Sequence, residues 1–274
     1  MKKFYIISRD DRPERMEIIN KITSYIEKNG GTCGYTLIDS VPYGIPKDTQ
    51  CVISLGGDGT FARAIQRSTN YEIPFIGCNL GHLGYLCELD SDTIIPSLER
   101  MMNENIPCQK RMLLEGGIDG HAMLKAVNDV VLKCSSNTQI ANLCVEVNGQ
   151  YLYSYNCDGI IVSTPTGSTG YNLSTGGPIV DPSARVILVT PLNAHALNTR
   201  SIVLGAEDEV RIRLMPRKRG SVKENVDVRI DGALCGTLKV GDSVTVRASE
   251  ASAKVFMLSN LSFLERIRKK MMGD

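Results

Sequence analysis

The sequence is poor in the residues that mark several classes of protein. Its 274 residues include no tryptophan and only three histidines, so a histidine metal cluster is not expected. No apolar stretch approaches the roughly 20 residues that span a bilayer. Neither sign of charge dominates, with 31 Lys and Arg against 30 Asp and Glu, whereas a non-specific nucleic-acid binder is usually more basic. These absences predict a protein without nucleic-acid or membrane partners.

The sequence contains nine cysteines, but no two have the spacing of a zinc or redox site. None of the nine forms the CxxC pattern that zinc and redox sites typically use. Most lie among apolar residues, as Cys51 and Cys144 do. We therefore expect reduced, metal-free thiols packed as small hydrophobic side chains. The first apolar stretch, at 4–7, is too short for a signal peptide, and the protein is expected to be cytoplasmic.

The pattern of secondary-structure signals changes near residue 110. Before this point strand signals at 4–7, 34–38, 51–55 and 73–76 alternate with helical signals at 13–28, from 60 and at 94–103. This order predicts an α/β domain at 1–105 with a mainly parallel sheet. Short β-rich runs then continue to about 255, with Asn148-Gly149 as a hairpin turn, and predict an antiparallel β domain. The segment 262–272 is basic and predicts a helix.

The segment GGDGT at 56–60 lies between the apolar run 51–55 and a stretch with helical spacing. A glycine turn that opens a helix directs backbone N–H groups at a phosphate. A carboxylate in such a turn repels phosphate unless a metal or a hydroxyl proton lies between them. Asp58 therefore indicates phosphoryl chemistry, and few stabilising partners are expected for it in the free protein. The alternative is a tight turn with a helix-capping aspartate.

Two further segments are rich in glycine and follow apolar strands. One is NLGHLGYL at 79–86, and the other is the Ser, Thr and Gly segment that follows Asp158. Ligands in open α/β sheets bind beyond the carboxyl ends of strands. Hydroxyl and N–H groups suit phosphate and ribose oxygens, and Tyr171 could stack on a base; an exposed loop is the alternative. Asn128 and Asp129 interrupt an apolar run, as either a functional pair or a strand bulge.

Together these segments resemble the NAD kinase family. The family pattern of GGDGT, NLG…LG, an Asn-Glu pair and DG…STPTGSTAYxLSxGGP appears here in the same order. The matching segments are GGDGT at 56–60, NLGHLGYL at 79–86, Asn128-Asp129 and DGIIVSTPTGSTGYNLSTGGPIV at 158–180. A later TP…H segment at 190–197 and Asp231-Gly232 also match.

The resemblance implies an enzyme that transfers the γ-phosphoryl of ATP to the 2′-hydroxyl of the adenosine ribose of NAD, with a divalent metal ion, Mg²⁺. Asp58 matches the proposed general base. The implied nucleotide contacts are Asp58, Gly59, Arg63, Asn128, Asp129, Asp158, Thr169, Gly170, Tyr171 and Ser174. The alternative for Arg63 is a solvent-exposed arginine on a helix face without a role in binding.

The implied fold is a Rossmann-like α/β domain at 1–105, a β-sandwich at 106–255 that binds NAD, and a helix at 256–274 that returns to the first domain. Family members are usually homodimers or homotetramers, so the same is expected here.

Three positions depart from the family pattern. Asp129 replaces glutamate, Gly170 replaces alanine, and Asn156 stands where many members have a basic residue. The alternative function is a non-catalytic NAD(P)-sensing module of the same fold. A lipid or sugar kinase with a GGDG turn is a third hypothesis, which the long match at 158–180 disfavours.

Overall fold

The computed structural model describes residues 1–40, 45–81, 84–136, 140–194, 199–216, 225–259 and 261–272. It divides into two compact units, one of Met1–Arg111 with Ser252–Asp274 and one of Met112–Ala251. The strands β6 (Cys108–Ile118) and β17 (Ser243–Phe256) contain residues of both units. Among the described residues, no helix combines the length and the apolar character that a membrane crossing requires.

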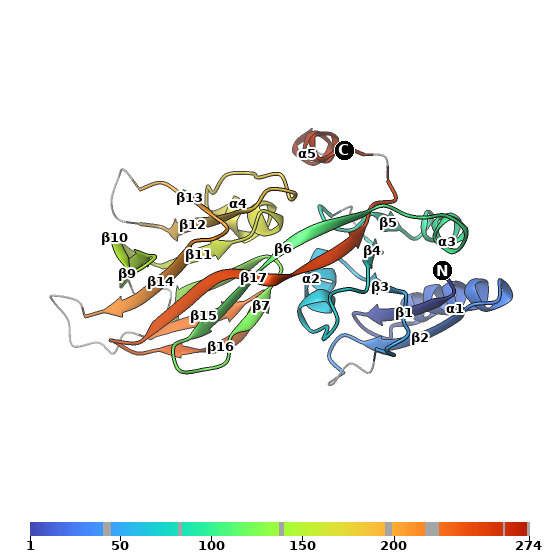
Figure 1. Ribbon diagram of the computed structural model, residues 1–274, viewed down its shortest axis with the longest axis horizontal. Coiled ribbons are helices and arrows are strands. Elements are labelled where there is room, and N and C mark those ends of the chain that lie inside the picture. The colour runs from blue at the N-terminus through green and yellow to red at the C-terminus, as the bar shows by residue number, and fades with distance from the viewer. Residues whose placement is uncertain are drawn as a thin grey trace. The chain divides into compact units, whose positions relative to one another are not determined.

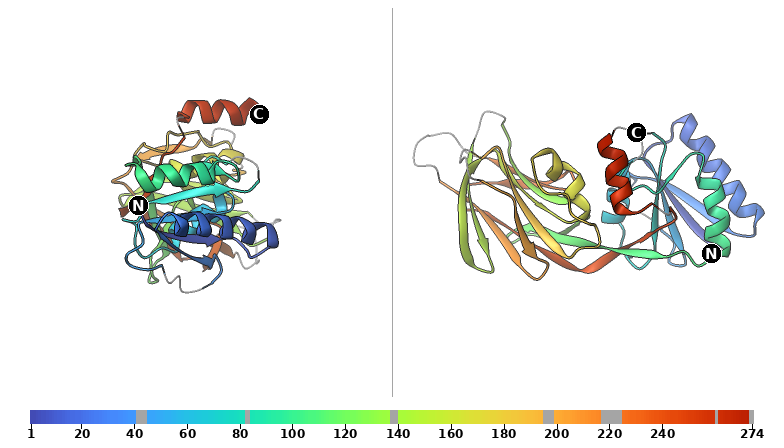
Figure 2. Two further views of the ribbon diagram at one scale, coloured as in Figure 1. Left: turned by 90° about the vertical axis from the view of Figure 1, so that its right-hand side faces the viewer. Right: turned by 90° about the horizontal axis from the view of Figure 1, so that it is seen from above.

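The first unit is a parallel α/β layer structure. Its strands run in the order β2-β1-β3-β4, each pair parallel. Every residue of β3 and β4 is buried, as expected for central strands covered on both faces. Figures 1 and 2 show α1 and α3 on one face of this sheet and α2 on the other. The elements are β1 (Lys3–Ser8), α1 (Pro13–Lys28), β2 (Thr32–Leu37), β3 (Cys51–Leu55), α2 (Asp58–Gln66), β4 (Phe75–Asn79), β5 (Leu89–Asp90) and α3 (Ile94–Asn103).

The C-terminal segment belongs to the same unit. At the end of β17, Val255 pairs in parallel with Phe75 of β4, and α5 (Phe263–Met272) follows. Phe256 and Leu258 are buried in the hydrophobic core formed by β1, β3, β4, α1 and α3. The expected return of the C-terminal segment to the first domain is therefore confirmed.

The second unit is an antiparallel β-sandwich. One sheet has the order β13-β12-β11-β8-β15-β16, and the other contains β10-β9-β14-β17 with β6 and β7. Alternate residues of β14 and β15 are buried, the period expected where one strand face meets a core. The strands are β7 (Leu124–Ala126), β8 (Asp129–Cys134), β9 (Ala141–Val147), β10 (Gln150–Cys157), β11 (Gly159–Ser163), β12 (Val186–Leu192), β13 (Ile202–Gly205), β14 (Glu209–Met215), β15 (Val226–Ile230) and β16 (Ala233–Leu238).

The predicted fold class is confirmed, with local differences. Asn148 and Gly149 both have positive φ, 51° and 76°, as the predicted hairpin turn between β9 and β10 requires. The strand β6 was not predicted, because charged residues at 110–111 and glycines at 116–117 interrupt its apolar pattern. The β-rich segment 122–134 forms two strands, β7 and β8, where its apolar pattern alone predicts one.

Candidate functional site

The GGDGT turn joins the end of β3 to the start of α2. Gly57 is the extended residue before the helix, and Asp58 is the first helical residue, two positions earlier than the sequence predicts. A Cβ on Gly56 would lie 2.5 Å from Thr60 Oγ1, so a side chain there would displace the first turn. The helix N-terminus therefore carries an acidic side chain in its first turn, which its unpaired N–H groups favour.

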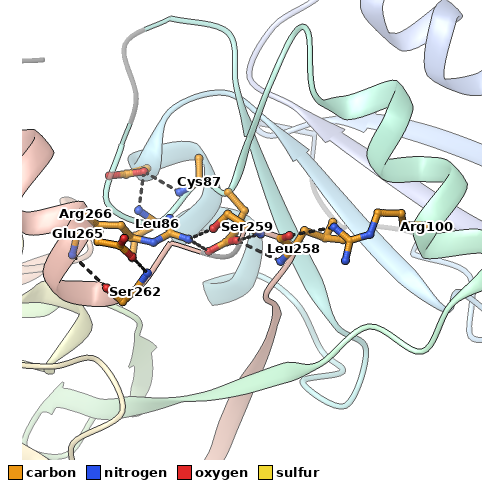
Figure 3. Close-up of polar contacts among 10 residues, drawn as sticks. Leu86, Cys87, Arg100, Leu258, Ser259, Ser262, Glu265 and Arg266 are labelled. Atoms are coloured by element: carbon orange, nitrogen blue, oxygen red, sulfur yellow. Dashed lines mark hydrogen bonds and ion pairs between the residues drawn. The ribbon is translucent and has the colours of Figure 1, made fainter.

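The Asp58 carboxylate is held by three consecutive backbone N–H groups. Oδ2 accepts a hydrogen bond from Tyr85 N at 2.7 Å, and Oδ1 accepts from Leu86 N at 3.1 Å and Cys87 N at 3.2 Å. Figure 3 shows the bonds from Leu86 and Cys87. The expectation that this carboxylate has few partners is wrong, because the second glycine segment supplies a cradle of amides. Asp58 is nonetheless only half-buried.

Gly84 explains why this cradle needs glycine. A Cβ at Gly84 would lie 2.0 Å from Asp58 Oδ1, far inside van der Waals contact. At Gly81, in the same segment, a Cβ would meet only Asn79 Oδ1 at 3.8 Å. The two glycine motifs, at 56–60 and 79–86, thus meet at Asp58. Of the second motif, His82 and Leu83 lie outside the described residues.

Gly59 and Arg63 lie on the same helix as Asp58. Gly59 is exposed, and a Cβ on it would have no neighbour within 4 Å. Arg63 Nη1 lies 3.6 Å from Asp39 Oδ1, and Arg67 Nη1 lies 3.7 Å from the same oxygen. Because Asp39 remains 74% exposed, this contact contributes little to stability and could be exchanged for an anionic ligand.

In the second unit, Asn128 lies in the break between β7 and β8, and Asp129 begins β8. Asp231 holds this backbone: its carboxylate accepts from Val127 N at 2.7 Å, and from Asn128 N and Asp129 N at 2.8 and 3.1 Å. The N–H of Asp231 donates to Asp129 O at 3.0 Å. Asp231 has a φ of 46°, a left-handed conformation that aspartate tolerates better than most residues.

The two acidic side chains here, Asp129 and Asp231, both have raised pKa values. Asp129 is only 6% exposed. Burial, together with the negative charge of Asp231, raises its pKa to about 7. Asp231 is partly exposed as a residue, but desolvation of its carboxyl group raises its pKa to about 6 against the opposing effect of its three N–H donors.

The segment after β11 packs against Asn128. Thr164 N and Ser163 Oγ donate to Asn128 O at 2.9 and 3.1 Å, and Thr164 Oγ1 donates to Val127 O at 2.6 Å. A Cβ on Gly167 would lie 2.2 Å from Asn128 O, so only glycine fits where the chain crosses this carbonyl. The structure thus brings the Asn128-Asp129 pair and the Ser, Thr and Gly segment together.

The next predicted contact residues lie in or between two short helices that sequence reasoning missed, η1 (Thr166–Thr169) and α4 (Tyr171–Ser174), which Gly170 joins. Thr169 is half-buried at the end of η1, whereas Gly170, Tyr171 and Ser174 are exposed. Between them, Asn172 is fully buried and accepts from Thr190 Oγ1 at 2.7 Å. The neighbouring side chains therefore face outward on a fixed base.

Asp158 and Tyr171 line a cavity of about 240 Å³ within the second unit. Asp158 Oδ2 accepts from Asn193 Nδ2 at 2.9 Å. The other lining residues are Lys133, Cys134, Ser136, Thr175, Leu192 and Asn193. His195, Ala196 and Leu197 of the later TP…H segment lie outside the described residues.

Sequence reasoning assigned no role to three polar side chains near these motifs. Thr166 is 4% exposed, and its Oγ1 is a buried hydroxyl without a hydrogen-bond partner among the described residues. Asp231 was noted only as part of a motif, although it holds the 127–129 backbone. Glu88 follows the amides that bind Asp58 and forms an ion pair with Arg266. Nothing in the sequence indicates that the Thr166 hydroxyl would be buried without a hydrogen-bond partner among the described residues.

The chain matches two family models. Residues 9–106 match the ATP-NAD kinase N-terminal domain, and residues 127–258 match the ATP-NAD kinase C-terminal domain. Among similar proteins, the NAD kinase of Agathobacter rectalis is 41% identical over 280 residues, covering 99% of each chain. The NAD kinase of Lachnospira eligens is 36% identical over 293 residues, covering 99% of this chain and 100% of that protein.

Solved structures are similar at lower identity. Yeast NADH kinase complexed with NADH has a TM-score of 0.86 and 21% identity, covering 100% of this chain and 88% of that one. An NAD kinase from Archaeoglobus fulgidus in complex with ATP has a TM-score of 0.75 and 20% identity, covering 99% and 97%. These two likenesses establish the fold.

Proposed function

The chain belongs to the ATP-NAD kinase family, and on this premise we propose that Asp58 is its general base. The enzyme is an NAD kinase: it transfers the γ-phosphoryl of ATP to the 2′-hydroxyl of the adenosine ribose of NAD, which gives NADP. The observation that carries the proposal is the cradle of three N–H groups around a half-buried carboxylate at the start of α2.

A fixed carboxylate suits this reaction because a ribose hydroxyl is a poor nucleophile at neutral pH. The cradle donates one hydrogen bond to Oδ2 and two to Oδ1, so Oδ2 retains a lone pair for the hydroxyl proton. Proton removal as the new O–P bond forms contributes roughly 10²–10⁴-fold to the rate. Positioning and stabilisation of charge on the transferred phosphoryl supply most of the remainder.

The dinucleotide contacts that we propose lie in both units. Gly59 offers an open approach at the start of α2, and Arg63 would exchange Asp39 for a phosphate oxygen. In the second unit the contacts are Asn128, Asp129, Asp158, Thr169, Gly170, Tyr171 and Ser174. The support for them is their fixed backbone, the exposed ring of Tyr171 and the cavity that Asp158 and Tyr171 share.

No group of three or more His, Cys, Asp and Glu side chains gathers within the described part of the chain, and the Asp58 oxygens already accept three hydrogen bonds. Mg²⁺ usually binds proteins through one or two carboxylates together with substrate phosphates. We therefore propose that the divalent ion, Mg²⁺, enters as part of the ATP complex.

Further proposals follow from the family. We propose a homodimer or homotetramer in the cytoplasm, with NAD and ATP as substrates and no nucleic-acid or membrane partner. We also propose the functional division into an α/β domain at 1–105, an NAD-binding domain at 106–255 and a returning helix at 256–274.

The test is a coupled assay with ATP, Mg²⁺ and NAD that detects NADP, run in parallel with NADH as acceptor. We expect NADP in proportion to enzyme, and loss of turnover in Asp58→Asn with most NAD affinity retained. Binding of NAD without any NADP would instead favour the sensing module. Normal turnover by Asp58→Asn would remove this residue from the role of base.

A further inference from the structure

Glu88 is a deeply buried carboxylate whose side-chain partners, among the described residues, all come from the C-terminal segment. Its side chain is 2% exposed. Oε2 accepts from Leu258 N at 3.1 Å and Ser259 N at 2.8 Å, and Oε1 forms an ion pair with the Arg266 guanidinium. Figure 3 shows this cluster. Within the described part of the chain, the Glu88 carboxylate therefore depends on this segment for its hydrogen bonds and its ion pair.

Arg266 is presented by a helix whose start is fixed. Ser262 and Glu265 form a capping box: Ser262 N donates to Glu265 Oε2 at 2.7 Å, and Glu265 N donates to Ser262 Oγ at 3.2 Å. The Arg266 side chain is 10% exposed. Upstream, Arg100 Nη1 donates to Leu258 O at 3.1 Å. The C-terminal segment is thus held at Leu258 by Arg100 and at Ser262 by the start of α5, and the Glu88 contacts to Leu258, Ser259 and Arg266 lie in this region.

Glu88 directly follows the residues that bind Asp58. Leu86 N and Cys87 N donate to Asp58 Oδ1, and Glu88 N donates to Gly77 O of β4 at 3.1 Å. The Glu88 side chain therefore fixes one end of the short amide segment, because a shift at Glu88 moves the adjacent Cys87 N–H. The direction of these N–H groups sets the position of the Asp58 carboxylate.

We propose that Glu88 and Arg266 are positioning residues for phosphoryl transfer, through which the C-terminal segment holds the 85–87 amides against Asp58. This inference rests on the proposed role of Asp58. The pair is not needed merely to attach the C-terminal segment to the first unit, because the buried side chains of Phe256 and Leu258 already do so. A buried ion pair is weak evidence for stability, because desolvation offsets its attraction.

The test compares Arg266→Met with Arg268→Met, which removes an exposed arginine from the same helix. We expect Arg266→Met to lower kcat by about tenfold or more and to change the KM for NAD by less than about threefold. Arg268→Met should leave both constants unchanged. Arg266→Lys, which keeps the charge, should recover part of kcat.

A second readout does not depend on the role of Asp58. Hydrogen exchange at the Tyr85, Leu86 and Cys87 amides should be faster in Arg266→Met, while exchange at the β3 amides stays as in the wild type. If Arg266→Met does not fold, the double variant Glu88→Gln/Arg266→Met replaces it, because it leaves no unpaired charge buried. Unchanged exchange at 85–87 in a folded variant would overturn the inference.

A double-mutant comparison separates this inference from the proposed function. If Arg266 acts through Asp58, its replacement should have little further effect on kcat in the Asp58→Asn background. Full additivity of the two effects contradicts the inference. Normal turnover by Asp58→Asn alone would overturn the role of the base, and the exchange measurement would still decide whether Arg266 holds the amides.

Discussion

The two units each contain an aspartate that accepts hydrogen bonds from three consecutive backbone N–H groups. In the first unit Asp58 accepts from residues 85–87 at 2.7–3.2 Å. In the second unit Asp231 accepts from residues 127–129 at 2.7–3.1 Å. The difference lies in what stands beside each carboxylate. A second acid, Asp129, lies next to Asp231 and has no hydrogen bond to its carboxyl group among the described residues.

The same geometry therefore serves opposite purposes. Around Asp58 the amides fix the carboxylate, which is the group with chemistry to perform. Around Asp231 the carboxylate fixes the amides, so that Asn128 and Asp129 keep their place beside the Ser, Thr and Gly segment. This arrangement destabilises the ionised form of Asp129, because burial beside another negative charge raises its pKa.

Asp58→Asn tests the first half of this comparison and has the largest expected effect. Asparagine keeps the size of the side chain but cannot accept the ribose proton, so kcat should fall by roughly 10²–10⁴-fold. It also offers one acceptor oxygen to three N–H groups, which should lower the free energy of unfolding by about 1–3 kcal/mol. The measurements are kcat, the Kd for NAD and denaturant unfolding.

Asp39→Asn is the matched control, because it removes a carboxylate from the same unit that binds only Arg63 and Arg67 among the described contacts. It should retain most of kcat. If Asp58→Asn retains more than about a tenth of wild-type kcat, Asp58 is not the base.

Gly84→Ala should perturb the same cradle without changing a charge. Its Cβ would lie 2.0 Å from Asp58 Oδ1, and the resulting shift of about 1 Å can lower kcat by about 10²-fold. Gly81→Ala is the control in the same motif, since its nearest contact would be at 3.8 Å. Equal activity of the two variants would show that turnover tolerates movement of the Asp58 carboxylate.

The sequence was sufficient to predict each motif and the type of each domain. The glycine turn follows an apolar strand, and the change from helical to two-residue periodicity marks the second domain. These signals are local, since they depend on residues within about ten positions of each other. The start of α2 was missed, and the interruption at Asn128 and Asp129 was left open between a functional pair and a bulge, because contacts from distant residues such as Asp231 shape the backbone there.

The supporting contacts could not be predicted for the same reason. Asp231 is 103 residues from Asn128, and Arg266 is 178 residues from Glu88. No spacing rule connects residues so far apart. The expectation that Asp58 has few partners failed because its donors are backbone groups, which exist at almost every position and leave no trace in residue identity.

Asp231→Asn tests the second half of the comparison. Asparagine tolerates the positive φ of this position, but its NH₂ group faces N–H donors and satisfies none of them. We expect the KM for NAD to rise about tenfold, with a smaller change in kcat, because the Asn128 backbone loses its anchor. Asp227→Asn, on β15 just before Asp231, loses contacts only to Ser135, Thr237 and Arg229 among the described residues and should keep a normal KM. A normal KM in Asp231→Asn would contradict the anchoring role.

Asp129→Asn tests the comparison through the pH dependence of the unfolding free energy, and its expected effect is the smallest. Because the pKa of Asp129 is raised in the folded protein to about 7, folding favours its protonated form. This stabilisation is complete below the pKa of the unfolded chain, near 3.9, and is lost as the pH rises through about 7. The wild type should lose about 1 kcal/mol of unfolding free energy from this group between pH 6 and pH 8.

The variant should be less sensitive to pH, because the asparagine side chain cannot ionise and only the Asp231 contribution, which has the same sign, remains. Denaturant unfolding at pH 6, 7 and 8 at constant ionic strength measures the difference. Asp227→Asn again serves as the control and should retain the wild-type slope. If the unfolding free energy changes equally with pH in Asp129→Asn and the wild type, the raised pKa does not belong to Asp129. The two amide cradles would then differ in exposure and purpose but not in the charge beside them.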